Sequence, residues 1–207
     1  VFRFPRRTIA VGSIRMEGKL LPKLEAYMTI PYPKPLFYGE TSEEFPAPFL
    51  GYTYVPGSFP IGLTEDHRAL SAETLAIFLR RLHEFPVQTA LKCGAQQDHR
   101  NLTDIASRKV KLEGFLSKVV EHLSPEESGV LEAYISSLQK DRVETVNALL
   151  HGDLHFKNML VNENGIITGI IDWGDLSVGH PACDLSVAYS FLPPYARSDF
   201  FETYGGA

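Results

Sequence analysis

The chain has 207 residues, of which 44% are hydrophobic and 22% are charged, and its formal net charge is -5. This composition is typical of a soluble globular protein and argues against disorder of the chain as a whole. The negative charge argues against a nucleic-acid-binding protein that uses a broad basic surface. Cys93 and Cys183 have no metal-ligand spacing and predict a reduced, cytoplasmic protein. No apolar run approaches the roughly 20 residues of a membrane helix.

The first 57 residues are rich in proline and aromatic residues and predict a small strand-rich lobe with one helix. Alternation of apolar and polar residues predicts a strand over 1–4, and apolar positions within 12–27 predict a helix. Short apolar runs at 36–38 and 49–55 predict two further strands. Pro56-Gly57 ends the second of these runs sharply.

From Thr64 onward the pattern becomes helical. Ser71 is a predicted cap for a helix whose apolar residues follow the i, i+3, i+4, i+7 spacing, at Leu75, Phe78, Leu79 and Leu82. A second amphipathic helix is predicted over 101–123. A third begins at Ser124-Pro125-Glu126-Glu127, which is a capping box with proline at the first helical position.

Three short apolar runs, at 148–150, 159–161 and 166–171, predict a compact β region after these helices. Asn164-Gly165 lies between the last two runs and is a strong signal for a hairpin turn. The predicted fold is therefore α+β. It has a β-rich lobe over 1–57 and a larger, mainly helical lobe over 58–207, and a cleft between two unequal lobes is a natural ligand site.

The segment from His151 to Asn158 contains the most informative polar residues. Asp153 and Asn158 lie five residues apart, just before the predicted hairpin, and Asp172 follows its second strand. Because the hairpin register centres on the turn, Asn158 and Asp172 are predicted at the same end of the sheet. Two carboxylates and one amide oxygen should therefore converge on a small volume.

Such an arrangement suits phosphoryl transfer. Mg²⁺ takes oxygen ligands and usually keeps several waters, so one carboxylate and one amide can hold it. The second carboxylate then orients an acceptor hydroxyl and takes its proton. The spacing favours Asn158 and Asp172 as metal ligands and Asp153 as the catalytic base.

His-x-Asp-x-x-x-x-Asn over 151–158, followed by an apolar strand and Ile170-Ile171-Asp172-Trp173-Gly174, resembles the aminoglycoside phosphotransferase and choline kinase family. The segment Gly179-His180-Pro181-Ala182-Cys183-Asp184-Leu185 is similar to the one that follows the metal aspartate in that family. The resemblance implies a two-lobed protein-kinase-like fold. It also implies transfer of the γ-phosphate of ATP or GTP, with Mg²⁺, to a hydroxyl of a small molecule.

The resemblance extends to further residues. It implies that Arg3 occupies the strand position that serves the nucleotide phosphates and that Glu17 is its helix partner. Thr53 and Val55 would offer backbone groups to a purine. His155 would contact phosphate or acceptor, and two residues would support the site: His151 would shape the catalytic loop, while Asp184 would cap a helix and brace that loop.

The chain departs from the family pattern at both ends. It begins at the strand of Arg3, so the glycine-rich hairpin that precedes this strand in relatives is expected to be missing. The helices that complete the acceptor pocket after the Asp184 segment are expected to be missing as well. The acceptor is open between an aminoglycoside-type antibiotic and a similar metabolite, and the phosphate donor is open between ATP and GTP. The oligomeric state is open as well.

Two alternatives stay open at this level. A metallohydrolase could use the cluster of His151, Asp153 and His155 to bind a transition metal. That alternative makes no use of Asn158 or of the hairpin leading to Asp172. A nucleotide-binding relative without catalytic activity is the second alternative, although it would be expected to lose those polar residues.

Overall fold

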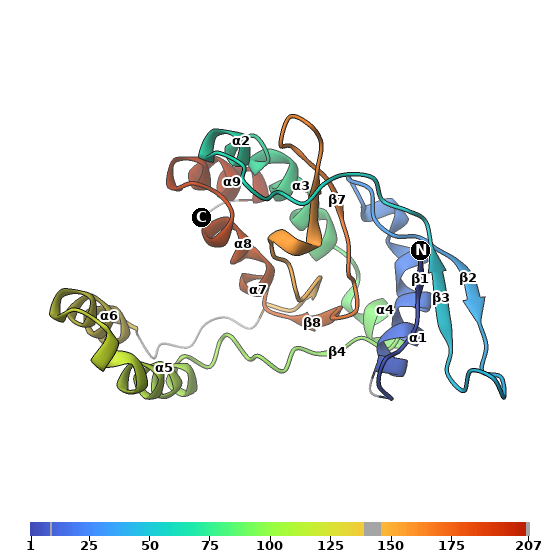
Figure 1. Cartoon of the computed structure of the whole chain (residues 1–207), viewed down its shortest axis with the longest axis horizontal. Coiled ribbons are helices and arrows are strands. Elements are labelled where there is room, and N and C mark those ends of the chain that lie inside the picture. Colours follow the sequence, from blue (N-terminus) through green and yellow to red (C-terminus); the bar gives the residue numbers. More distant parts are fainter. Residues whose placement is uncertain (9, 139–145, 206–207) are drawn as a thin grey trace. The chain divides into compact units, whose positions relative to one another are not determined.

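The computed structural model describes residues 1–8, 10–138 and 146–205. The chain divides into two compact units, the first formed by Val1–Asp98 and Asn147–Ala207 and the second by His99–Val146. The elements of both are labelled in Figure 1. The lobe boundary predicted at residue 57 falls inside the first unit and stays a prediction.

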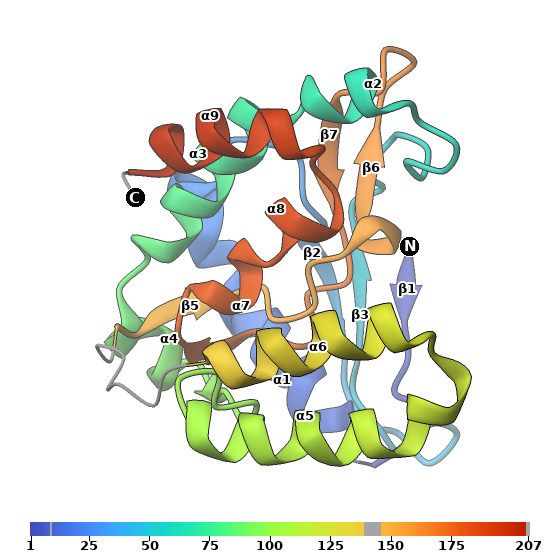
Figure 2. The same ribbon diagram turned by 90° about the vertical axis from the view of Figure 1, so that its left-hand side faces the viewer.

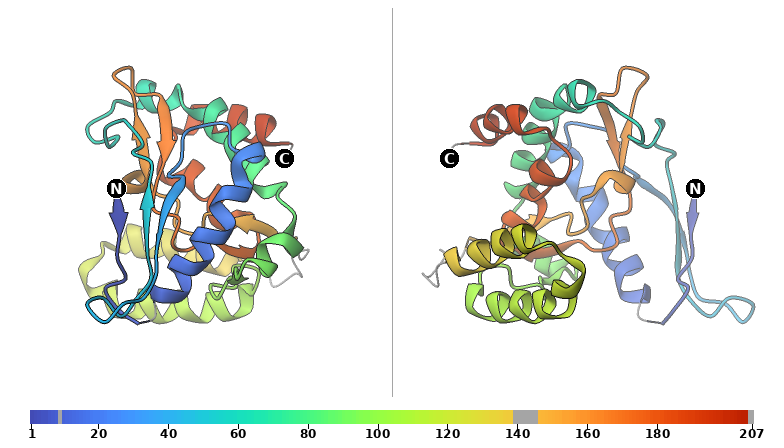
Figure 3. Two further views of the ribbon diagram at one scale, coloured as in Figure 1. Left: turned by 90° about the vertical axis from the view of Figure 1, so that its right-hand side faces the viewer. Right: turned by 60° about the vertical axis from the view of Figure 1, so that its left-hand side comes forward.

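A three-stranded antiparallel sheet opens the first unit. Its strands are β1 (Phe2–Arg3), β2 (Pro35–Gly39) and β3 (Phe49–Tyr52), in the order β1-β3-β2. Helix α1 (Ala10–Leu20) lies beside this sheet (Figure 3, left). The sheet buries Leu50 and Tyr52 toward the helix, which contributes Ile14 and Leu20 to the same core.

The helix predicted over 12–27 is wrong in its second half. The α-helix ends at Leu20, and a 3-10 helix, η1 (Leu21–Tyr27), continues from it. Pro22 lies in the first turn of η1 and has no N–H to continue the α-helical bonding pattern. The strand predicted over 49–55 is also shorter, because β3 ends at Tyr52.

Two further sheets follow in the C-terminal half of the first unit. β5 (Ala148–Leu150) pairs with β8 (Ser177–Gly179), which also pairs with β4 (Gln96–Gln97). β6 (Met159–Val161) and β7 (Ile167–Ile170) form the predicted hairpin, and Gly165 turns it with a φ of 77°. The expected turn at Asn164-Gly165 is therefore confirmed.

Helices complete the first unit: α2 (Glu65–Ala69), α3 (Ala72–His83), α4 (Val87–Lys92), α7 (Ala182–Leu185), α8 (Val187–Ser190) and α9 (Arg197–Tyr204), with short 3-10 turns η3 (Phe156–Asn158) and η4 (Pro194–Ala196). α3 and α9 lie side by side (Figure 2). The predicted apolar face of α3 is confirmed, because Leu75, Phe78, Leu79 and Leu82 are all buried.

Ser71 precedes α3, but its hydroxyl does not cap the helix as predicted. The hydroxyl accepts a hydrogen bond from the N–H of Ile167 and donates one to the carbonyl oxygen of Gly165. Ser71 is completely buried, so these bonds satisfy backbone groups of the hairpin that water cannot reach. The residue ties α3 to the β6–β7 turn.

The second unit consists of α5 (Ile105–Val119), a short 3-10 turn η2 (Val120–His122) and α6 (Pro125–Ser137), and the two long helices lie side by side (Figures 2 and 3). The capping box predicted at Ser124 and Glu127 is confirmed by both of its hydrogen bonds. Three apolar residues of the amphipathic helix predicted over 101–123, Val110, Phe115 and Val119, are exposed on α5. The helix is therefore present, but these residues are not part of a buried core.

Candidate active site

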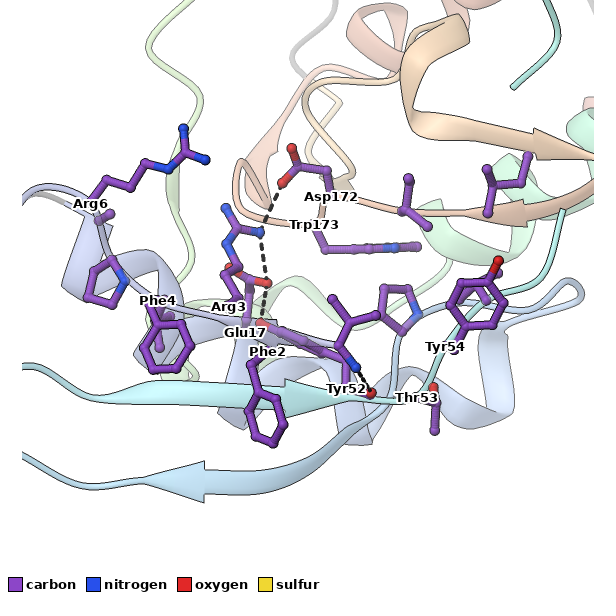
Figure 4. Close-up of a pocket in the computed structure, with 18 of the residues that line it drawn as sticks. Phe2, Arg3, Phe4, Arg6, Glu17, Tyr52, Thr53, Tyr54, Asp172 and Trp173 are labelled. Carbon is purple, nitrogen blue, oxygen red and sulfur yellow. Dashed lines mark hydrogen bonds and ion pairs between the residues drawn. The ribbon is translucent and has the colours of Figure 1, made fainter. Parts of the chain in front are cut away.

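A cavity of about 1000 Å³ lies within the first unit, between the N-terminal sheet and the end of the β6–β7 hairpin. Figure 4 shows its lining, with Arg3, Glu17 and Asp172 near the middle and Thr53 and Tyr54 toward one end. The walls are mostly apolar, and the charged side chains are few. A cavity of this size is suited to a small molecule such as a nucleotide.

Arg3 links the two acidic residues of the cavity. Its Nη1 lies 2.9 Å from Oδ1 of Asp172 and 3.2 Å from Oε2 of Glu17 (Figure 4). Tyr52 donates a hydrogen bond of 2.7 Å from its hydroxyl to the same Glu17 oxygen. The structure therefore brings together Arg3, Glu17 and Asp172, which lie up to 169 positions apart in the sequence.

Burial shapes the electrostatics of this cluster. Glu17 is only 1% exposed, and burial raises its pKa although Arg3 and the Tyr52 hydroxyl act in the opposite direction. Burial opposes the charge of Arg3 as well, but the nearby Glu17 and Asp172 outweigh it, so the pKa of Arg3 is raised. Arg3 thus stays a cation whose charge is compensated by its two carboxylate neighbours.

Asp172 follows β7 in a left-handed backbone conformation, with a φ of 60°. This conformation is uncommon for residues other than glycine, and it is often found at functional sites. The side chain is 55% exposed and faces the cavity. Gly174 lies against the Arg3 guanidinium, since a Cβ there would come within 2.4 Å of Nη2 of Arg3. Glycine at this position therefore permits the approach of Arg3 to Asp172.

Asp153 and Asn158 are held together by direct hydrogen bonds. The Asn158 amide nitrogen donates to the Asp153 carbonyl oxygen at 2.8 Å and to its Oδ2 at 3.1 Å. Both N–H groups of the amide are thus directed at Asp153, and Oδ1 of Asn158 is left for another partner. The Ile171 N–H donates to the Asn158 carbonyl oxygen at 2.9 Å, so the hairpin brings Asn158 next to the residue preceding Asp172.

His155 lies next to the proposed base. Its Nε2 is 3.4 Å from Oδ2 of Asp153, and its Nδ1 accepts a hydrogen bond from the Lys157 N–H. The side chain is 40% exposed. His155 is therefore positioned beside Asp153, and the predicted contact with phosphate or acceptor stays a prediction.

His151 is completely buried, and both of its ring nitrogens are hydrogen-bonded. Nε2 lies 3.1 Å from the Ile171 carbonyl oxygen and must carry the proton, while Nδ1 accepts from the Asp153 N–H. Burial lowers the pKa of His151, which keeps the ring neutral. The side chain links the catalytic loop to the end of β7, as a residue that shapes the loop would.

Asp184 is also completely buried and accepts bonds from the catalytic loop. Its two oxygens take the N–H of His151 at 2.7 Å and that of Gly152 at 3.0 Å. The predicted capping role is wrong, because Asp184 lies inside α7 and the residue that precedes this helix is Pro181. The contacts with the loop are those that a bracing residue would make.

Sequence analysis did not identify His83, which the structure places next to Asp184. Its Nε2 is 3.3 Å from Oδ2 of Asp184, and its Nδ1 is 2.8 Å from the Tyr204 hydroxyl. Burial acts to raise the pKa of Asp184, but His83, His151 and the loop N–H groups outweigh it, and the net pKa is lowered. A signal was present: His83 follows the apolar positions of α3 at i+4 from Leu79, where a polar residue requires a buried partner.

Thr53 and Val55 line the cavity, and Figure 4 shows Thr53 toward one end of it. The Thr53 N–H donates to the Lys34 carbonyl oxygen, so it is not available to a ligand. Within the described residues, no hydrogen bond is formed by the Thr53 carbonyl oxygen or by the Val55 N–H. The described cavity lining therefore includes two residues, Thr53 and Val55, that carry a backbone acceptor and a backbone donor without a partner among the described residues.

The metallohydrolase alternative receives no support from this geometry. Both ring nitrogens of His151 are already engaged, so the ring cannot bind a metal without losing those bonds. Among the residues that the structure describes, no three His, Cys, Asp or Glu side chains are grouped closely enough to hold a metal ion. Asn158 and Asp172 together fit a different donor set, consisting of one amide and one carboxylate oxygen.

Within the described ranges, no helix is both long enough and apolar enough to cross a membrane.

A family model described as "Phosphotransferase enzyme family" matches residues 1–207. The "Uncharacterized protein YcbJ" of Bacillus subtilis (strain 168) is 29% identical over 222 residues, which cover 100% of this chain and 68% of that protein.

Two solved structures are similar over the whole chain. The GDP and kanamycin complex of APH(2")-IIIa has a TM-score of 0.72 at 24% identity and covers 100% of this chain and 71% of its own. The apoenzyme of macrolide 2'-phosphotransferase MphH from Brachybacterium faecium has a TM-score of 0.65 at 24% identity. The match covers 100% of this chain and 69% of that one. The predicted α+β, protein-kinase-like fold is confirmed by these similarities.

Proposed function

The chain belongs to the phosphotransferase enzyme family, whose members are small-molecule kinases, and we propose that it transfers the γ-phosphate of ATP or GTP to a hydroxyl of an aminoglycoside-type antibiotic or a similar metabolite. One observation supports this proposal most directly. The same cavity is lined by Thr53 and Val55, which carry backbone groups without a partner among the described residues, and near its middle by the Arg3, Glu17 and Asp172 cluster. The β6–β7 hairpin connects Asp172 to the Asp153–Asn158 pair.

The purine of the nucleotide binds at Thr53 and Val55 in this proposal. The Thr53 carbonyl oxygen accepts a hydrogen bond from the base, and the Val55 N–H donates one to it. Apolar side chains such as Leu160 and Ile171 line the cavity and suit the faces of an aromatic ring. Both purines present donors and acceptors on one edge, so the backbone pair is compatible with ATP and with GTP.

Mg²⁺ would be held by Oδ1 of Asn158 and the carboxylate of Asp172. The chemistry of this donor set fits the ion, because Mg²⁺ prefers oxygen ligands and keeps several waters. The hydrogen bonds from the Asn158 amide nitrogen to Asp153 fix which amide atom remains available. When bound, the ion supplies positive charge that neutralises the phosphate oxygens during transfer.

Asp153 acts as the base in this scheme. Its side chain is 45% exposed, so an acceptor hydroxyl can reach it, and Asn158 orients one of its oxygens. The carboxylate orients the hydroxyl and takes its proton as the new O–P bond forms. The bond from the γ-phosphorus to the bridging oxygen of the β-phosphate breaks in the same transfer, and ADP or GDP leaves. Arg3 stays near the phosphates and is itself positioned by Glu17.

The acceptor is proposed from similarity alone. A structure with the same fold is a complex with GDP and kanamycin, and another is a macrolide phosphotransferase. An aminoglycoside is the first candidate to test, followed by macrolides, choline and simple sugars. The experiment that tests the proposal measures transfer of labelled phosphate to each acceptor of this panel. ATP and GTP are used as donors separately, each with Mg²⁺.

Transfer to one acceptor would establish the reaction and identify the substrate class. Mg²⁺-dependent nucleotide binding without transfer to any acceptor would instead favour a non-catalytic relative. Absence of both binding and transfer would contradict the proposal as a whole.

Replacing Asp172 with asparagine tests the proposed ion site. Asparagine tolerates the left-handed backbone, so the substitution removes a charge with little added strain. We expect the affinity for the nucleotide in the presence of Mg²⁺ to fall by about tenfold or more, because a charged ligand is lost. Titration calorimetry at several Mg²⁺ concentrations measures this.

The control for this substitution is Asp199→Asn, which removes an exposed carboxylate of α9 that does not line the cavity. Its affinity should stay within about twofold of wild type, the small effect usual for an exposed charge. An Asp172→Asn variant whose nucleotide binding keeps the full dependence on Mg²⁺ would remove Asp172 from the ion site.

A further inference from the structure

Arg6 lies between β1 and α1 and lines the same cavity as Arg3. The cavity is lined by four charged side chains among the described residues, namely Arg3, Arg6, Glu17 and Asp172. Arg3 forms ion pairs with both carboxylates, whereas Arg6 forms no ion pair or side-chain hydrogen bond in the described part of the chain. Arg6 is therefore the uncompensated cation of the cavity.

The charge balance of the cavity indicates a role for Arg6. The cluster of Arg3, Glu17 and Asp172 has one positive and two potential negative charges, so it repels phosphate on its own. A nucleoside triphosphate adds further negative charge, which the proposed Mg²⁺ compensates only in part. A second cation would stabilise these phosphates, and Arg6 is the cationic side chain of the described cavity that has no ion-pair partner among the described residues.

The position of Arg6 indicates which phosphate it serves. Figure 4 shows Thr53 and Tyr54 toward one end of the cavity, Arg3 and Asp172 near the middle and Arg6 toward the opposite end. A nucleotide whose base lies at Thr53 and whose phosphates pass Arg3 therefore extends toward Arg6. Arginine suits that place because its planar guanidinium can bind two phosphate oxygens at once.

We infer that Arg6 binds the terminal phosphates of the nucleotide and makes the site selective for triphosphates over monophosphates. The inference rests on the proposed function, because it assumes that a nucleotide fills the cavity with its base at Thr53. Arg7 provides a natural comparison: it is the adjacent residue, has the same charge and is also exposed, but it does not line the cavity.

This inference is tested by measuring the dissociation constants of the full chain for the tri- and monophosphates of adenosine and guanosine, in the presence of Mg²⁺. Arg6→Gln should weaken triphosphate binding about tenfold, as expected for the loss of a charge-assisted hydrogen bond. Monophosphate binding should change less than about twofold, and Arg7→Gln should change neither. Arg6→Lys should lie between wild type and Arg6→Gln, because it keeps the charge but not the planar fork.

The outcomes separate the inference from the proposed function. Equal losses of triphosphate affinity in Arg6→Gln and Arg7→Gln would show that the effect comes from general surface charge, and they would overturn the inference. Equal losses for tri- and monophosphates would also overturn it, since they would indicate a disturbed fold. Triphosphate binding unchanged in Arg6→Gln would overturn the inference alone, whereas a wild-type chain that binds no nucleotide would overturn the proposed function as well.

Discussion

Replacing Asp153 with asparagine should lower kcat for phosphate transfer by roughly 10² to 10⁴, the usual contribution of a general base. The change keeps the size of the side chain and one oxygen for the Asn158 amide, but it removes the group that takes the proton. Nucleotide affinity should stay within about threefold of wild type, because Asp153 does not line the cavity. Steady-state kinetics and equilibrium binding measure the two quantities separately.

The control for Asp153→Asn is Glu163→Gln, which removes an exposed carboxylate from the turn of the β6–β7 hairpin. Its kcat should be unchanged. A fall in nucleotide affinity as large as the fall in kcat would assign Asp153 a structural role. Retention of most of the wild-type kcat in Asp153→Asn would exclude it as the base.

The sequence predicted those parts of the candidate site that depend on short-range geometry. Asp153, Asn158 and Asp172 could be grouped because a hairpin register is fixed by its turn, here Asn164-Gly165. The observed pairing of β6 with β7 and the contact between Asp153 and Asn158 agree with this expectation. The approach of Arg3 to Glu17 was expected only through family resemblance, since no local rule joins a strand residue to a helix residue across a sheet.

Long-range polar contacts could not be read in the same way. Ser71 was expected to cap α3, but its hydroxyl bonds to Gly165 and Ile167 instead, more than 90 residues away. His83 had no neighbour in the sequence that indicated its partner Asp184, which lies 101 positions away. Propensity and periodicity describe local structure, whereas tertiary contacts decide which local option a buried polar side chain takes.

The exposed residues of α5 show a related limit. Periodicity predicted an amphipathic helix, and the helix is present, but its apolar residues Val110, Phe115 and Val119 are exposed. A periodic pattern indicates that a helix has an apolar face, and it does not identify what that face contacts.

Replacing Asp184 with asparagine should destabilise the chain by about 3 kcal/mol or more, because it breaks a fully buried network of charge-assisted bonds. The amide nitrogen of the new side chain would face either a loop N–H or His83, which are both donors toward Asp184 in the present arrangement. For a chain of this size, such a loss corresponds to a Tm lower by roughly 6–12 °C. Differential scanning calorimetry measures the change.

Two comparison variants define what the network contributes. His83→Phe keeps the ring contact with Tyr204 but removes the hydrogen bonds of the imidazole to Asp184 and to the Tyr204 hydroxyl. The Asp184 carboxylate keeps its two bonds from the loop, so a smaller loss of about 1–2 kcal/mol is expected. Glu202→Gln on the exposed side of α9 should leave the Tm unchanged. A Tm for Asp184→Asn equal to that of Glu202→Gln would show that the carboxylate is not needed to hold the loop.

The pH dependence supplies a second test of Asp184. Its pKa in the folded chain lies below the ordinary value of 3.8, because its bonds to His83, His151 and Gly152 outweigh the effect of burial. The stabilisation is therefore present above the unfolded pKa and is lost as the pH falls through the folded pKa. An unfolded aspartate has a pKa of about 4. The difference in Tm between wild type and Asp184→Asn should therefore be constant at about pH 5–7, above that value, and should shrink as the pH falls below it. A difference that does not change on acidification would mean that the buried carboxylate is not ionised in the folded chain, and the charge-based account of the loop would be wrong.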